Sequence, residues 1–310
     1  MLTAFAALVP VILLIVAGFW LRRTILPDEM QWNGIERLTF YVLFPALIIN
    51  TLAHADLSRV PVFGVGGALF LAILIMAALC LAMRPWLAAR FAIGGPAFTS
   101  ILQGATRWNT FVALVLAASL FETLGVALAS VAIVAMIPVL NVINVWALAR
   151  FASQNPRTGS AIFGALMANP LIWSCVVGLA LNVLGLPLVG PLRAFADALG
   201  RASLACGLLS VGAGLQIAGL IRPSPAILLT TALKLVLMPA LAISLGLLFG
   251  VTGASLGVVA CCSAVPAPPG SYVMARQMGG DAVLLAQILT VQTLLAIVTM
   301  PIAIAIASLY

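Results

Sequence analysis

The sequence predicts an all-α polytopic membrane protein, and three observations support this. Of its 310 residues, 64% are hydrophobic and only 7% are charged, whereas a soluble domain carries roughly 25% charged residues. The mean hydropathy is +1.26. The apolar residues fall into runs of about 20, the length that a helix needs to cross a bilayer. A soluble enzyme, a nucleic-acid-binding protein and a disordered chain are therefore excluded, and the lipid bilayer is the expected partner.

Ten apolar segments are long enough to be transmembrane helices. The connections between them are short, so we expect one membrane domain with no separate soluble part. The predicted spans are residues 2–21, 34–53, 61–83, 96–119, 124–149, 160–184, 194–219, 225–249, 254–277 and 281–308.

The basic residues predict the orientation, because loops on the cytoplasmic side are enriched in Arg and Lys. With the N-terminus outside, nine Arg residues fall at cytoplasmic ends and three at external ends. An even number of spans then places the C-terminus outside as well. The cytoplasmic set is Arg22, Arg23, Arg37, Arg84, Arg90, Arg150, Arg157, Arg222 and Arg276, and the external set is Arg59, Arg193 and Arg201.

An internal repeat follows from the order of features along the chain. The same three features occur late in each half of the chain: a polar or Pro-rich break, an acidic residue (Glu122 or Asp281) and a long last helix. The features of the second half follow those of the first by roughly 160 residues. Each half has five spans, and tandem halves with an odd number of spans must face opposite ways. We therefore expect an inverted five-plus-five repeat, with residues 1–150 and 151–310 as its two halves.

The fourth and ninth spans are predicted to be broken helices. Residues 103–110 form a polar island inside an apolar run, and residues 266–270 contain three Pro and one Gly. Pro and Gly interrupt a helix, and a break at membrane depth is tolerated only where it lines a cavity or is buried in protein. Paired breaks at matching positions point to a transport site. The expected crossover and hinge residues are Trp108, Pro266, Pro268 and Pro269.

The two breaks favour an anion as the ligand. New half-helices begin near Thr110 and Ser271, and their free N–H groups and positive dipole ends would point at the midplane. Arg107 adds a full charge, and a bound carboxylate can offset the cost of that charge in the membrane. A second interpretation stays open, in which Arg107 caps backbone carbonyls or snorkels. The candidate substrate-binding residues are Arg107, Asn109, Thr110, Gly270, Ser271, Asn50 and Asn141.

The remaining polar groups give weaker signals. Asn144 and Gln292 are interpreted as hydrogen-bonding glue between helices, and Lys234 is expected to snorkel toward the cytoplasm. All seven acidic residues fall near loops or span ends, so no carboxylate is expected at mid-membrane to relay protons. With one His and five scattered Cys, we expect no metal site and no cofactor.

Several stretches resemble the auxin efflux carrier family, over essentially the whole chain. They read GATRWNTFVALVLAASLF, PVLNVINVWALARF, MANPLIWSCVVGLALNVLGLPL, LLSVGAGLQ and PPGSYVMARQMGGDAVLLA. The resemblance implies crossing broken helices four and nine, a scaffold and a transport subdomain with elevator-like movement, organic-anion substrates and a homodimer. The family's crossover Asn falls on Asn109, whereas Gly270 stands where many members have a second Asn. The short connection at 150–159 is typical of the bacterial malonate and malate permease branch, which implies a bacterial-type inner membrane.

The favoured hypothesis is therefore a secondary carrier of small mono- or dicarboxylates. A sodium-coupled carrier of another five-plus-five family, moving larger organic anions or metabolites, is the alternative, and it would need a polar ion cage. A channel would need a continuous polar stripe, which is not evident. An intramembrane enzyme would need a catalytic dyad, and the one histidine, His54, lies at a span end.

Overall fold

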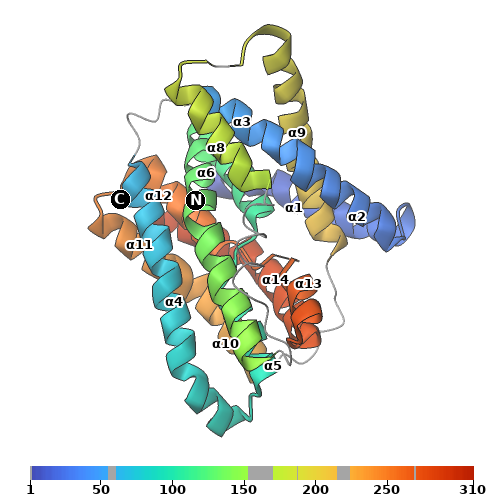
Figure 1. Ribbon diagram of the computed structural model, residues 1–310, viewed down its shortest axis with the longest axis vertical. Coiled ribbons are helices and arrows are strands. Elements are labelled where there is room, and N and C mark those ends of the chain that lie inside the picture. The colour runs from blue at the N-terminus through green and yellow to red at the C-terminus, as the bar shows by residue number, and fades with distance from the viewer. Residues whose placement is uncertain (1, 55–60, 153–169, 187, 215–223, 269) are drawn as a thin grey trace.

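The protein is an all-helical membrane protein. Its computed structural model describes residues 2–54, 61–152, 170–186, 188–214, 224–268 and 270–310, and all regular structure in these ranges is helical (Figure 1). Within them, six stretches are long and apolar enough to cross a membrane: Glu29–His54, Val62–Phe91, Gly95–Phe151, Gly190–Ala213, Pro225–Leu248 and Ala282–Ala307. The predicted class is confirmed, while the number of ten spans stays a prediction.

The described helices follow the predicted apolar segments. In chain order they are α1 (Leu2–Thr24), α2 (Glu29–Leu38), η1 (Thr39–Leu43), α3 (Phe44–His54), α4 (Val62–Phe91), α5 (Gly95–Thr106), α6 (Thr110–Phe151), α8 (Pro170–Val183), α9 (Gly190–Ala213), α10 (Pro225–Ala232), η4 (Leu233–Leu237), α11 (Met238–Leu248), α12 (Gly253–Ala264), α13 (Gly270–Met278) and α14 (Ala282–Ala307).

Two of the long helices contain a π-helical turn just before a proline. η1 ends at Leu43, two residues before Pro45, and η4 ends at Leu237, two residues before Pro239. A proline has no N–H to donate, and its ring clashes with the carbonyl four residues earlier. The wider π turn accommodates the proline, so each helix continues through the bilayer with a local bulge.

A break at Glu122 divides α6 into two helices. The backbone of Glu122 has φ 51° and ψ −133°, which is not helical. A positive φ is unusual for a residue that carries a Cβ atom. The break falls between the predicted spans 96–119 and 124–149, so this boundary is confirmed.

The helices pack as two groups that meet along α6 (Figure 1). The first helix group consists of α1, α3, α8 and α9, and the second consists of α4, α5, α6 and α10 to α14. In the first group, glycines bring two backbones together. A Cβ atom on Gly18 would overlap the carbonyl of Leu209, and one on Gly212 would overlap the carbonyl of Ile15. Small residues permit such close approach in membrane proteins, and here they fix α1 against α9.

Candidate functional site

The first predicted break lies between α5 and α6. α5 ends at Thr106 because Arg107 is extended, with φ −72° and ψ 154°. Asn109 then caps α6: its side-chain oxygen accepts hydrogen bonds from the backbone N–H groups of Phe111 (3.1 Å) and Val112 (3.3 Å). Two of the helix's free donors are therefore already satisfied by the chain. This limits the predicted role of the N-terminus of α6 in holding an anion.

The second predicted break lies between α12 and α13, and it touches the first. Val265 is extended, with φ −66° and ψ 149°, and α13 begins at Gly270. The backbone N–H of Asn109 donates to the carbonyl of Pro266 at 2.8 Å. The two unwound segments are thus joined directly by their backbones.

Gln292 of α14 holds the two breaks together from behind. Its side-chain NH2 donates to the carbonyl of Gly104 at 3.0 Å, and its side-chain oxygen accepts from the N–H of Ala267 at 3.0 Å. Gln292 is fully buried. One side chain therefore satisfies a backbone group of each interrupted helix, which confirms the interpretation of Gln292 as a link between helices.

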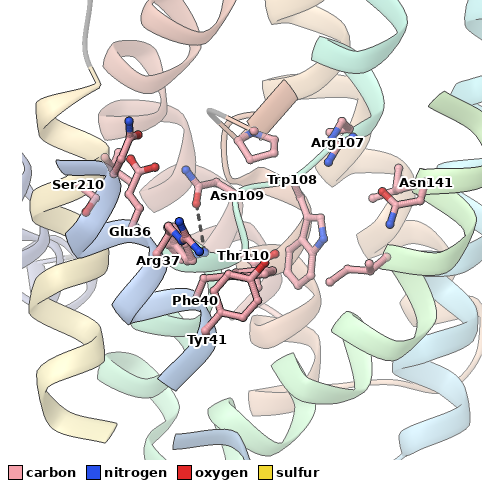
Figure 2. A pocket seen from close by; sticks show the side chains of 17 residues that line it. Glu36, Arg37, Phe40, Tyr41, Arg107, Trp108, Asn109, Thr110, Asn141 and Ser210 are labelled. Atoms are coloured by element: carbon pink, nitrogen blue, oxygen red, sulfur yellow. Dashed lines mark hydrogen bonds between the residues drawn. The ribbon is translucent and has the colours of Figure 1, made fainter. Parts of the chain in front are cut away.

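A cavity of about 580 Å3 lies against the joined breaks. We call it the crossover cavity. In the view of Figure 2, Arg107 and Asn141 lie on one side of it, while Glu36, Arg37 and Ser210 lie on the other. Its lining residues are Asn33, Glu36, Arg37, Phe40, Tyr41, Arg107, Trp108, Asn109, Thr110, Phe111, Ile137, Leu140, Asn141, Ser210, Val211, Pro268 and Gly270.

Arg107 is partly buried at this cavity and has a weak partner. Its guanidinium donates to the sulfur of Met274 in α13 at 3.2 Å. In the described part of the chain it forms no ion pair with a carboxylate. A thioether is a weak acceptor, so a carboxylate that enters the cavity can replace it as the partner of Arg107.

A second cavity, of about 550 Å3, adjoins the first. The two share Asn33, Glu36, Asn109, Val211 and Gly270. We call the second one the basic cavity because its lining includes three arginines, Arg22, Arg23 and Arg276, against two glutamates, Glu29 and Glu36. Together with Arg37 and Arg107, these charges favour the entry of anions.

A third cavity, of about 1310 Å3, lies at the opposite ends of the same helices. We call it the Glu122 cavity. In the stretch from α2 to α3, the crossover cavity is lined by residues within 33–41 and the Glu122 cavity by residues within 47–54. In α9, the crossover cavity is lined by residues 210–211 and the Glu122 cavity by residues within 190–201. At 1.5 Å per helical residue, the layer between the cavities is about 10 Å thick.

Two stacked aromatic rings lie at this layer. Phe44 and Phe111 have ring centroids 4.9 Å apart and ring planes at 23°. Phe44 is fully buried, and a Cβ atom on Gly207 would lie 3.2 Å from its ring. We call Phe44, Phe111 and Gly207 the septum. Phe44 and Gly207 lie between the residues that line the crossover cavity and those that line the Glu122 cavity, and Phe111 forms part of the wall of the crossover cavity.

The structure brings most of the candidate binding residues together. Arg107, Asn109, Thr110, Asn141 and Gly270 line the crossover cavity, as do the hinge candidates Trp108 and Pro268. Pro266 contributes the carbonyl that joins the breaks.

Three candidates lie elsewhere. Asn50 lines the Glu122 cavity, with its side-chain oxygen unpaired among the described residues. Ser271 is buried beside the crossover cavity but does not line it. Pro269 is outside the described residues.

One expectation from the sequence is wrong. Lys234, in η4, does not snorkel, because its side chain is fully buried. Glu36 lies near the start of the helical stretch Glu29–His54, as expected, but it also lines both joined cavities, a role that was not predicted. Glu36 could have been singled out from the sequence, because a Glu-Arg pair within a segment that starts an apolar span marks a polar face.

These features define a class of protein: a helical membrane protein in which interrupted helices meet at a cavity with excess positive charge, as in secondary transporters. Residues 158–304, just under half of the chain, match the family described as membrane transport protein. Over that part, the resemblance to the auxin efflux carrier family is confirmed, and the match favours a carrier over an enzyme. The comparison with curated proteins found no match.

Proposed function

We propose that the protein is a secondary transporter of small organic anions, such as malonate or malate, which bind at the crossover cavity. The observation that carries this proposal is Arg107, a guanidinium at the joined breaks whose described partner is only a thioether sulfur. Arg binds carboxylates through two parallel hydrogen bonds. A dicarboxylate would leave its second carboxylate for Arg37 on the other side of the cavity or for the side-chain NH2 of Asn109.

The proposed topology is an inverted five-plus-five repeat of ten spans, with both termini outside a bacterial-type inner membrane. The positions of the arginines support it. Arg22, Arg23 and Arg276, all expected on the cytoplasmic side, line one cavity, whereas Arg193 and Arg201, expected outside, line the Glu122 cavity. The first helix group would be the scaffold of an elevator-like carrier and the second its moving part. A homodimer is part of this proposal.

The septum supports alternating access rather than a continuous pore. Cavities approach the crossover from both ends of the same helices, but a layer about 10 Å thick divides them. Among the residues that the structure describes, the crossover cavity shares five lining residues with the basic cavity and none with the Glu122 cavity. The protein would therefore be open toward the predicted cytoplasmic side.

A thermal-shift screen of the purified protein in detergent tests the proposal. Malonate, malate, succinate, acetate and indole-3-acetate would each be added with and without Na+. A ligand at 100 times its Kd stabilises the folded state by about 2.7 kcal/mol, so small carboxylates are expected to raise the unfolding temperature. Stabilisation by none of these anions would contradict the proposal. A shift that requires Na+ would favour the sodium-coupled alternative.

Shortening Phe44 to alanine is expected to make the carrier leaky. The substitution removes a buried ring that lies between the residues lining the two cavities. Proteoliposomes preloaded with radiolabelled malonate should then lose it without any anion outside to exchange. Phe98→Ala is the matched control, because Phe98 is equally buried but packs against Phe151, away from the septum. Both variants should lose about 3–5 kcal/mol of stability. Equal retention of malonate by both would show that the septum is not the barrier.

A further inference from the structure

Lys234 is an unusual group for the interior of a membrane protein. It is the only lysine in the sequence. Its side chain is fully buried, and its Nζ atom has no hydrogen-bond partner among the described residues. It lines none of the three cavities described above. The proposed binding of an organic anion gives this group no role.

Lys234 lies level with the first break, in a turn that packs against α5. Gly104 of α5 faces Thr230 of α10, since a Cβ atom on Gly104 would lie 2.7 Å from the Thr230 methyl group. One turn earlier, Ile101 and Ala226 share one apolar cluster. α5 and α10 therefore run in the same direction, and Lys234, one turn after Thr230, comes level with the segment that follows Thr106.

No carboxylate faces Lys234 from the helices packed against η4. These helices are α5, α10, α11, α12 and α14, and their described residues include no Asp, Glu, Arg or His. The titratable groups on them are the thiols of Cys261 and Cys262 in α12, which are both fully buried. Arg107, just after α5, points instead to Met274.

The ends of two helices near the breaks favour a positive charge at Lys234. α5 and α12 both end at the breaks, and the C-terminal end of a helix carries partial negative charge. An ammonium without hydrogen-bond acceptors is strongly disfavoured in an apolar interior, and Lys234 has three donors when protonated. The neutral amine is therefore the form that fits the present conformation. A nearby anion would favour the protonated form.

We propose that Lys234 is a proton-binding site of the transport cycle, which takes up a proton when the organic anion binds at the crossover and releases it with the anion. The amine lone pair accepts one proton from water to give the ammonium, and the ammonium returns one proton to water on the other side. The link between proton uptake and anion binding rests on the proposed anion transport. The ability of Lys234 to bind a proton does not depend on it.

The first test follows Lys234 directly by NMR. Because the chain has one lysine, protein labelled with 13C at lysine Cε gives one side-chain signal, whose position reports protonation. Recorded from pH 5.5 to 9.5 in detergent, it should move in a single step, and saturating malonate should shift the midpoint upward by about one pH unit, a tenfold change in proton affinity. A signal that stays at one position over the whole range would overturn the proposal. A titration of Lys234 whose midpoint does not change with malonate would show that proton binding is not linked to anion binding.

The second test measures coupling in proteoliposomes. With one proton moved per anion, a pH difference of one unit should drive malonate accumulation up to about tenfold in the wild type. Lys234→Met keeps the unbranched shape without a titratable group, and it should still exchange malonate but no longer accumulate it. Thr231→Val is the control, because it removes a buried polar group in the neighbouring turn that also lacks a partner in the described structure. Accumulation by Lys234→Met equal to that of the control would overturn the role of Lys234.

Discussion

Arg107→Ala is expected to weaken malonate binding by about 30-fold to several thousandfold. Truncating one partner of a buried, hydrogen-bonded charge pair costs about 2–5 kcal/mol, and each 1.4 kcal/mol is tenfold in affinity. Arg107 offers the one guanidinium located directly on the joined breaks among the described residues. Isothermal titration calorimetry of the purified variants with malonate measures the effect.

Three further variants separate charge from geometry at this position. Arg107→Lys should recover only part of the affinity, because Lys lacks the planar fork that binds both carboxylate oxygens. Met274→Leu removes the thioether acceptor and should leave binding unchanged or slightly tighter. Arg90→Ala, at the exposed end of α4, controls for the loss of one positive charge. Wild-type affinity in a folded Arg107→Ala protein would place the anion elsewhere.

Gln292→Leu is expected to lower the free energy of unfolding by about 2–6 kcal/mol. Leucine has a similar volume, but the carbonyl of Gly104 and the N–H of Ala267 would both lose their partner in the interior. Each buried polar group left unsatisfied costs about 1–3 kcal/mol. Side-chain hydrogen bonds between membrane helices average only about 0.6 kcal/mol, because alternative partners exist. Here both partners are backbone groups at interrupted helices, so the larger estimate applies.

Unfolding of the purified variants in detergent, followed by circular dichroism, measures this loss. Gln287→Leu is the matched control, since Gln287 lies in the same helix, is half-buried and makes no side-chain hydrogen bond within the described residues. The control should unfold like the wild type. Equal stability of the two leucine variants would mean that the breaks do not depend on Gln292.

The features predicted from the sequence were those with a local cause. Pro266 and Pro268 cannot continue a helix, and the polar residues from Gln103 to Thr110 cannot face lipid, so both breaks were predictable. The break inside α6 at Glu122 was also predictable, because this acidic residue falls between two apolar runs of membrane-spanning length. Apolar runs of membrane-spanning length also give the helices without any knowledge of their partners.

The features that were not predicted depend on which helix faces which. The burial of Lys234 follows from the positions of α5, α12 and α14, which a single sequence does not contain. The same holds for Gln292, whose two partners lie 188 and 25 residues away along the chain. Glu36 lies near the start of its helical stretch, and only the packing of that stretch brings it to the crossover cavity.

The thin septum has a consequence for the electric field across the membrane. Water and ions in the cavities would conduct, so the membrane potential would fall mainly across the layer of about 10 Å that contains Phe44 and Phe111, rather than across the full 30 Å of hydrocarbon. Moving one charge through the whole potential is worth about 2.3 kcal/mol per 100 mV. An anion that crosses this layer would therefore experience nearly the whole membrane potential. A proton carried with the anion would neutralise one of its negative charges, and that charge would then add nothing to the voltage dependence of transport.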